Sequence, residues 1–298
     1  MGTKTAKRTI GGVIPPMLTA FTESGEVYEK GVRNTVEFLS TRANGLFICG
    51  TYGSGLIMTP AQRKQVAEIC VDQAAGRIPI IVQVGCADTE TAVELAKHAE
   101  QVGADAVASI APYYYTYTQQ ELRGYYMALI DAVEIPVYAY NNPKTSGNPL
   151  SPKLIKDLAD HGLAGLKDSS FDILNFYKFA EAVNNPDFNL IVGTEGIMFP
   201  AMMCGARGVV SGVANVYPEK VRELYDAVLA HKYDRANELQ MVVLALRDVI
   251  KLGPTVPICH EVLKLRGIDG GTVRSPFLPA GDEVMAKVKK ALADLGMI

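Results

Sequence analysis

Apolar residues along this chain occur in short uninterrupted runs that alternate with longer stretches, where they recur every three or four positions. A short apolar run is typical of a strand buried on both faces of a sheet, and the longer spacing is typical of a helix with one buried face. Thr59-Pro60 and Ser151-Pro152 indicate helix starts, because each pairs an N-capping hydroxyl with a proline in the first turn. The pattern therefore predicts buried strands that alternate with amphipathic helices.

The predicted strands follow one another along the N-terminal part of the chain. They fall near residues 13–21, 45–49, 79–84, 104–110, 135–140, 163–167, 190–192 and 208–213. Helices are expected between them at 29–40, 89–102, 119–132 and 198–203, and from about residues 59, 151 and 171. Eight strand–helix units predict an α/β fold, a (β/α)8 TIM barrel. The competing doubly wound sheet usually carries a glycine-rich turn after its first strand, whereas Gly53 and Gly55 follow the second.

The character of the chain changes after Asn215. Helical periodicity continues over residues 218–231, 236–251, 255–265 and 282–295, with no strand between these segments. Their apolar surface is small for a unit that folds alone. We therefore predict a barrel at residues 1–215 and a C-terminal helical extension at residues 216–298 that packs on it.

Composition and charge exclude several classes of partner. The chain carries 29 basic and 32 acidic residues, a net charge of −3, and no basic run of the kind that binds nucleic acid. No apolar run reaches the length of a membrane span, and the first ten residues lack the apolar core of a signal peptide. The five cysteines have no metal-binding spacing, so we interpret them as buried thiols in a reducing compartment. We expect a cytoplasmic protein with a small-molecule partner, no nucleic acid, no membrane and no metal.

A lysine stands at the end of the sixth predicted strand, in the sequence Leu166-Lys167-Asp168. If this side chain stays inside the protein, the loss of water disfavours its ammonium form and lowers its pKa. A neutral lysine amine is a nucleophile that forms Schiff bases with carbonyl compounds. The alternative is a side chain that extends past the strand end and reaches solvent.

Other polar residues end neighbouring strands, and in a (β/α)8 barrel these strand ends meet on the one face where function collects. Tyr140 ends the fifth strand and Thr51 follows the second. A lysine nucleophile needs a proton carrier, and a tyrosine hydroxyl can fill this role if a neighbouring hydroxyl orients it. Thr51 is the candidate neighbour, and the turn from Thr51 to Gly53 can aim backbone N–H groups at a carboxylate.

Five motifs carry a resemblance to a known family, and they stand in family order along the whole chain. They are GTYGSG at 50–55, PYY at 112–114, YNNP at 140–143, GLKDSS at 165–170 and GVVSGVAN at 208–215. With them the chain resembles the pyruvate-dependent class I aldolases, the group of dihydrodipicolinate synthase and N-acetylneuraminate lyase. By this resemblance Lys167 forms the Schiff base with a 2-oxo acid, and Tyr140 carries the proton. Thr51 and Tyr114 complete the hydroxyl relay, with Tyr114 acting across a dimer interface.

The resemblance also implies an assembly and a substrate pocket. The family is commonly a homotetramer built as a dimer of dimers, and it needs no metal or organic cofactor. The substrate-binding positions that it implies in this chain are Thr51, Tyr52, Gly53, Thr145, Glu195 and Val210.

Several positions depart from the family pattern. Tyr52 stands where a second hydroxyl residue usually holds the substrate carboxylate, and Ser54 replaces the usual glutamate. Thr145 stands where the synthase branch has an arginine for the carboxylate of its second substrate, and the adjacent Lys144 is expected to point elsewhere. Around Glu195 the acidic and hydroxyl set of the sialic-acid branch is mostly missing. We therefore predict that uncharged or hydroxylated aldehydes are better substrates than aspartate semialdehyde.

The sequence as a whole predicts a Schiff-base-forming lyase that acts on 2-oxo acids. The favoured reaction is reversible aldol cleavage of a 2-oxo-3-deoxy (sugar) acid to pyruvate and an aldehyde, and dehydration of a similar acid would use the same imine. One alternative is a synthase that condenses pyruvate with an aldehyde in the dihydrodipicolinate reaction. An arginine from the helical extension, for instance Arg274, would favour that synthase. Another alternative is a pyruvate-binding barrel without turnover, which Tyr52 and Ser54 leave open.

Overall fold

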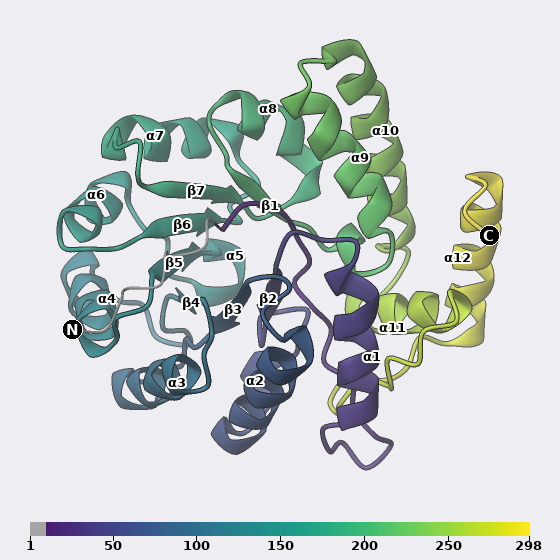
Figure 1. Ribbon diagram of the computed structural model, residues 1–298, viewed down its shortest axis with the longest axis horizontal. Helices are drawn as coiled ribbons and strands as arrows, with labels where there is room; N and C mark the ends of the chain where they lie inside the picture. The colour runs from purple at the N-terminus through teal and green to yellow at the C-terminus, as the bar shows by residue number, and fades with distance from the viewer. Residues whose placement is uncertain (1–9) are drawn as a thin grey trace.

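The computed structural model describes residues 10–298 and confirms the predicted (β/α)8 barrel (Figure 1). Eight parallel strands lie in one sheet in the order β1-β8-β7-β6-β5-β4-β3-β2. The strands are β1 (Gly12–Ile14), β2 (Leu46–Ile48), β3 (Ile80–Gln83), β4 (Ala106–Ile110), β5 (Val137–Asn141), β6 (Gly165–Asp168), β7 (Asn189–Val192) and β8 (Gly208–Val210).

The first two strands close the ring without a regular ladder. The backbone N–H of Phe47 donates to the Pro15 carbonyl at 3.0 Å, and the N–H of Met17 donates to the Phe47 carbonyl at 3.0 Å. Proline has no N–H to contribute to a ladder, so regular pairing of β1 ends at Ile14. The predicted strand at 13–21 is therefore wrong beyond Ile14.

Helices surround the barrel and cover the outer face of its strands (Figure 1). The helices between the strands are α1 (Glu29–Ser40), α2 (Pro60–Ala74), α3 (Thr89–Gln101), α4 (Gln119–Ala132), α5 (Pro143–Ser146), α6 (Pro152–Asp160), α7 (Ile173–Val183) and α8 (Met198–Met203). Short 3-10 turns follow three strands, at η1 (Gly55–Ile57), η2 (Glu195–Ile197) and η3 (Val213–Asn215). Thr59 caps α2 through a reciprocal capping box with Gln62, as the hydroxyl-proline pattern predicts.

Four further helices form the C-terminal part of the chain. They are α9 (Pro218–Leu229), α10 (Tyr233–Val249), α11 (Thr255–Leu265) and α12 (Asp282–Asp294). α9 packs against β1 and α8, so it takes the place of the eighth helix of the barrel. α10 lies along α9 and contacts η2, while α12 lies outermost beside α10 (Figure 1). The division of the chain at residue 215 remains a prediction, and α10 brings the extension to the mouth of the barrel.

Two apolar clusters fill the fold. The larger cluster lies between the strands and the surrounding helices. The smaller one lies inside the barrel and includes Ile14, Phe47, Ile81 and Tyr140. Because side chains alternate across a strand, these positions point inward while their neighbours face the helices. The barrel interior is therefore a packed core, and the strand ends above it are left to build a cavity.

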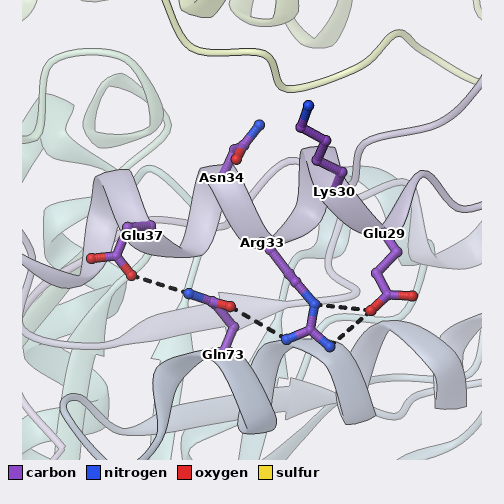
Figure 2. A pocket seen from close by; sticks show the side chains of 6 residues that line it. All are labelled: Glu29, Lys30, Arg33, Asn34, Glu37 and Gln73. Atoms are coloured by element: carbon purple, nitrogen blue, oxygen red, sulfur yellow. Dashed lines mark hydrogen bonds and ion pairs between the residues drawn. The ribbon is translucent and has the colours of Figure 1, made fainter.

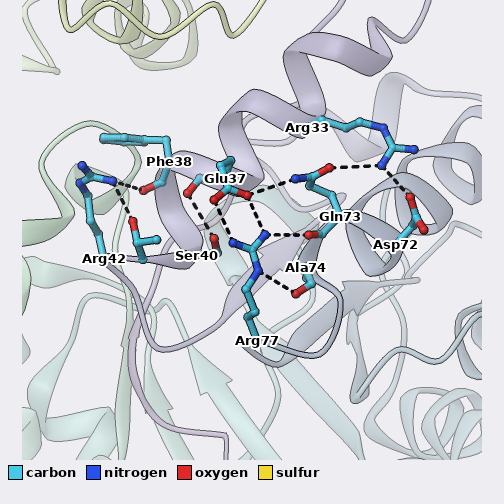
Figure 3. Close-up of polar contacts among 10 residues, drawn as sticks. Arg33, Glu37, Phe38, Ser40, Arg42, Asp72, Gln73, Ala74 and Arg77 are labelled. Carbon is cyan, nitrogen blue, oxygen red and sulfur yellow. Dashed lines mark hydrogen bonds and ion pairs between the residues drawn. The ribbon is translucent and has the colours of Figure 1, made fainter.

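Ion pairs fasten α1 to α2 on the outer surface. Arg33 of α1 binds Glu29 at 2.8 Å and Asp72 of α2 at 2.6 Å, and Glu37 binds Arg77 at 2.7 Å (Figure 2, Figure 3). A surface hollow of about 520 Å³ lies among the charged groups of α1. Exposed pairs of this kind contribute roughly 0–1 kcal/mol each to stability. Since these acidic and guanidinium groups already bind one another, we do not treat the hollow as a ligand site.

Within residues 10–298, no helix combines the length and the apolar character needed to cross a bilayer. The expectation about a signal peptide falls on residues 1–9, which lie outside the described residues. All five cysteines are free thiols, and four of them are buried as predicted, while Cys204 is half-buried. The same described range contains no group of three or more side chains placed to hold a metal ion.

Candidate active site

Lys167 lies near the end of β6, with Tyr140 of β5 beside it in the register of the sheet. Its side chain is 4% exposed, so the alternative in which it reaches solvent is wrong. The Nζ atom lies between two aromatic rings, 3.8 Å from the ring centroid of Phe47 and 3.6 Å from that of Tyr140. Burial lowers the pKa of Lys167, although Tyr140 opposes part of the effect. More of the amine is therefore neutral and nucleophilic than for a lysine in water.

Besides Lys167, the hydroxyl of Tyr140 has two polar neighbours. Thr51 Oγ1 lies 3.4 Å from the hydroxyl oxygen, and the side-chain amide of Asn142 donates to it at 3.0 Å. Burial alone would raise the pKa of Tyr140. The charge of Lys167 and the hydrogen bonds from Thr51 and Asn142 outweigh burial, so this pKa lies below its ordinary value. Lys167 and Tyr140 therefore form a coupled pair that can exchange a proton.

The turn after β2 has the form of an anion-binding nest. Within the described residues, no hydrogen-bond acceptor is found for the backbone N–H groups of Thr51, Tyr52 and Gly53. A Cβ atom on Gly53 would lie 2.8 Å from the Met17 carbonyl oxygen, so only glycine lets the turn pack this closely. The glycines here form a tight turn, and the three free N–H groups can bind a carboxylate.

The bulky side chain of Tyr52 occupies the space beside Gly212, which follows β8. A Cβ atom on Gly212 would lie 2.1 Å from the Tyr52 hydroxyl oxygen. The tyrosine ring therefore fills the volume that a side chain at position 212 would need, so Tyr52 and Gly212 fit one another. Burial raises the pKa of Tyr52 well above its ordinary value, so its hydroxyl stays protonated as a donor.

Glu195 joins the barrel to the C-terminal helices. One carboxylate oxygen lies 2.9 Å from Arg247 Nε on α10, and the other accepts a hydrogen bond from the Ser211 hydroxyl at 2.7 Å. The side-chain amide of Gln240, also on α10, donates to the Glu195 backbone carbonyl at 2.8 Å. The carboxylate is buried, and these partners hold it and the guanidinium in place.

These groups surround one cavity of about 380 Å³ at the C-terminal ends of the strands. The site residues predicted from the sequence that line this cavity are Lys167, Tyr140, Thr51, Tyr52, Thr145, Glu195 and Val210. Gly53 is buried in the turn beside them and does not line the cavity. Tyr114 is also absent from the lining, because it is 89% exposed on the surface of this subunit. The structure thus brings together all the predicted site residues except Gly53 and Tyr114.

Among the lining residues that the sequence analysis missed or misplaced, four carry charged or amide side chains. Lys144 lines the cavity beside Thr145, so the expectation that it points elsewhere is wrong. Arg247 and Lys251 also line it, and their spacing of four positions places them on one helix face without showing what that face contacts. Asn142 lines it as well. The arginine named from sequence, Arg274, instead binds the side chain of Gln62.

Comparison with known proteins agrees with this geometry. The family model for the dihydrodipicolinate synthetase family matches residues 9–295. An uncharacterized DapA-like lyase of Halobacterium salinarum is 35% identical over 289 residues, which cover 96% of this chain and 94% of the relative. The 4-hydroxy-tetrahydrodipicolinate synthase of Methanopyrus kandleri is 33% identical over 294 residues, which cover 97% of each chain.

A solved structure matches the fold closely. It is the crystal structure of YagE, a prophage protein of the dihydrodipicolinic acid synthase family from E. coli K12, in complex with pyruvate. The two structures superpose with a TM-score of 0.94 and 27% sequence identity, over 98% of this chain and 100% of YagE. Both the sequence match and the barrel with its buried lysine lead to one conclusion: this chain belongs to the dihydrodipicolinate synthetase family, a family of lyases.

Proposed function

We propose that this protein is a lyase that forms a Schiff base between Lys167 and a 2-oxo acid. The reaction that we favour is reversible aldol cleavage of a 2-oxo-3-deoxy acid to pyruvate and an aldehyde, and dehydration of a similar acid would begin with the same imine. The observation that carries the proposal is the buried Lys167 amine held against Tyr140, with Nζ 3.6 Å from the ring centroid. Pyruvate in the YagE complex supports the same class of ligand.

The proposed steps use the groups around the cavity. The neutral Lys167 amine attacks the C2 carbonyl of the acid, and water leaves as the imine forms. Deprotonated Tyr140 takes the proton from the C4 hydroxyl, the C3–C4 bond breaks, and the aldehyde departs from the enamine. Tyr140 then returns the proton to C3, and water releases pyruvate from the lysine. This sequence needs no metal or organic cofactor.

The substrate carboxylate would bind in the turn after β2. The free N–H groups of Thr51 and Tyr52, which line the cavity, supply donors without a charged side chain, and Gly53 shapes the turn that presents them. Val210, at the end of β8, lines the same cavity. Thr51 would also relay protons to and from Tyr140, since its hydroxyl lies 3.4 Å from that of Tyr140.

Tyr114 can join this relay only from a second copy of the chain. Its side chain is 89% exposed, and its backbone lies in the left-handed region with φ of 82°. Such a backbone is strained for tyrosine, and strain of this kind is typical of functional sites. Its ring packs edge to face against the ring of Tyr115, and both aromatic side chains are exposed on the surface. We therefore propose a homotetramer, a dimer of dimers, with Tyr114 at the tighter interface.

The aldehyde end of the cavity changes the substrate preference predicted from Thr145. Lys144, Arg247 and Lys251 line it, and Glu195 is the acidic residue among the charged lining groups. Lys144 and Lys251 have no ion-pair partner among the described residues. The premise of a pocket without a cation is therefore wrong. We propose that the aldehyde carries an anionic group, which makes the synthase that uses aspartate semialdehyde the second candidate function.

The free cysteines support a reducing, cytoplasmic setting for this enzyme. The function itself can be tested without knowing the aldehyde. Imine and enamine formation should exchange the methyl protons of pyruvate for deuterium in D2O, which proton NMR measures directly. Lys167→Ala should remove this exchange while the protein keeps its fold. A wild-type protein that binds pyruvate without exchange would instead support the pyruvate-binding barrel without turnover.

A further inference from the structure

The shortest hydrogen bond to the Tyr140 hydroxyl comes from Asn142. Its amide nitrogen lies 3.0 Å from the hydroxyl oxygen, against 3.4 Å for Thr51 Oγ1. Asn142 is 7% exposed and lines the cavity two residues after Tyr140. Tyr114 is exposed in this subunit and does not line the cavity. Apart from Lys167, Asn142 thus makes the shorter of the two hydrogen bonds that this subunit offers to the hydroxyl.

The backbone around Asn142 holds the amide in place. The Asn142 carbonyl accepts hydrogen bonds from the backbone N–H groups of Thr145 at 3.1 Å and Ser146 at 3.0 Å. It also accepts from the Ser146 hydroxyl at 3.1 Å. Pro143 follows as the first residue of α5, and its ring fixes the backbone direction there. The amide therefore meets Tyr140 from a rigid turn, which is the arrangement expected of a preorganised group.

The direction of this hydrogen bond decides its effect on the proton. The amide nitrogen can only donate, so the Tyr140 oxygen accepts and its own proton is left for Thr51 or for the substrate. A donor to this oxygen stabilises the deprotonated hydroxyl more than the neutral one. The titratable groups that face the Tyr140 hydroxyl are Lys167 on β6 and Tyr52 after β2. Burial raises the pKa of Tyr52, so it remains neutral while Lys167 and Asn142 act on Tyr140.

We propose that Asn142 is a positioning residue that orients the Tyr140 hydroxyl and supports its deprotonated form from within the same subunit. The proposal rests on the function proposed above. In that reaction deprotonated Tyr140 takes a proton from C3 of the pyruvate imine. The C3–H electron pair becomes the C2–C3 double bond of the enamine, and the positive imine nitrogen becomes neutral. The return of the proton, or of a deuteron, to C3 reverses these changes.

The test measures deuterium exchange into the pyruvate methyl group as a function of pH. At saturating pyruvate Lys167 is held as the imine, so its own titration does not shape the profile. Asn142→Leu should shift the rising limb of the pH profile to higher pH by about one pH unit. At a fixed pH on that limb, exchange should become about tenfold slower, because a hydrogen bond to a charged acceptor is lost. Asn142→Asp has nearly the same shape, can only accept, and should move the limb further in the same direction.

A double-mutant comparison separates positioning from a structural role. In a Tyr140→Phe background, Asn142→Leu should cause no further loss of exchange, because the group through which it acts is gone. Trapping of pyruvate by borohydride should remain intact in the Asn142 variants, which shows that the cavity is folded. An unchanged pH profile in both Asn142 variants would overturn the proposal. So would an equal loss with and without Tyr140, while a wild-type protein that exchanges no deuterium would overturn the proposed function as well.

Discussion

Replacing both Lys144 and Lys251 with glutamine removes two positive charges from the aldehyde end of the cavity. This perturbation leaves the ion pair between Glu195 and Arg247, 2.9 Å apart, in place. It also avoids the cost of a buried carboxylate without its partner, which replacement of Arg247 would cause. The double variant therefore tests charge at the cavity without disturbing the contact that holds α10 to the barrel.

The expected preference in kcat/KM for the anionic aldehyde follows from the exposure of these side chains. Lys144 and Lys251 are exposed, so each adds about 0.5 kcal/mol to the binding of an anion. A charge-assisted hydrogen bond from the half-buried Arg247 adds about 1.5 kcal/mol. The sum of about 2.5 kcal/mol corresponds to a preference of about 70-fold in kcat/KM for aspartate semialdehyde over glyceraldehyde. Loss of both lysines should lower this preference about fivefold.

The assay compares kcat/KM for the two aldehydes, each with saturating pyruvate and at low ionic strength. A matched control replaces Lys178 and Lys289, which are exposed, lie outside the cavity and change net charge equally. The cavity variant should lose activity toward the semialdehyde alone, and the control should keep both activities. A wild-type enzyme that prefers glyceraldehyde, or a cavity variant that loses both activities equally, would show that the three cations do not select the substrate.

Tyr140→Phe should keep the fold and lower turnover about 10²–10⁴-fold, and Thr51→Val should cause a smaller loss; a near-normal rate for the phenylalanine variant would mean that another group carries the proton. Light scattering should find a homo-oligomer, and Tyr114→Ala should weaken both assembly and turnover, whereas an active wild-type monomer would contradict the shared relay. Burial lowers the pKa of His260 to about 4, so between about pH 6.5 and 4 the unfolded chain binds the proton and the native state does not. Stability should therefore be full above that range and fall by roughly 3 kcal/mol as pH decreases through it. Denaturant titrations of wild type and His260→Gln should show this added pH dependence in the wild type alone, and parallel curves would refute it.

The sequence predicted most of the fold because the buried strands of a parallel barrel are local apolar runs. The strand predicted at 104–110 contains β4, and the strand predicted at 135–140 contains the start of β5. Lys167 was identifiable for a related reason, since a lysine that ends an apolar run must either desolvate or leave the core. The stretch at 13–21 was predicted as one strand although Pro15 and Pro16 break it, and the observed strand ends at that break because proline cannot donate to the ladder.

The cavity's specificity groups were harder to predict because they depend on tertiary packing. Arg247 and Lys251 reach the cavity only because α10 lies against η2, and no local pattern shows that contact. Asn142 contacts Tyr140 because α5 turns the chain directly after β5, which changes the direction of the side chain. Tyr114 is exposed in one subunit, so its predicted role depends on a second copy.

The most direct test of the central claim is to treat the protein with pyruvate and borohydride and to map the adduct by peptide mass spectrometry. Reduction of the imine should add the mass of the reduced pyruvate irreversibly to Lys167, because this amine is buried beside Tyr140 and its pKa is lowered. Lys167→Ala should give no adduct, while Lys144 and Lys251 should remain unlabelled as internal controls. An unmodified protein, or an adduct on a lysine other than Lys167, would contradict the account.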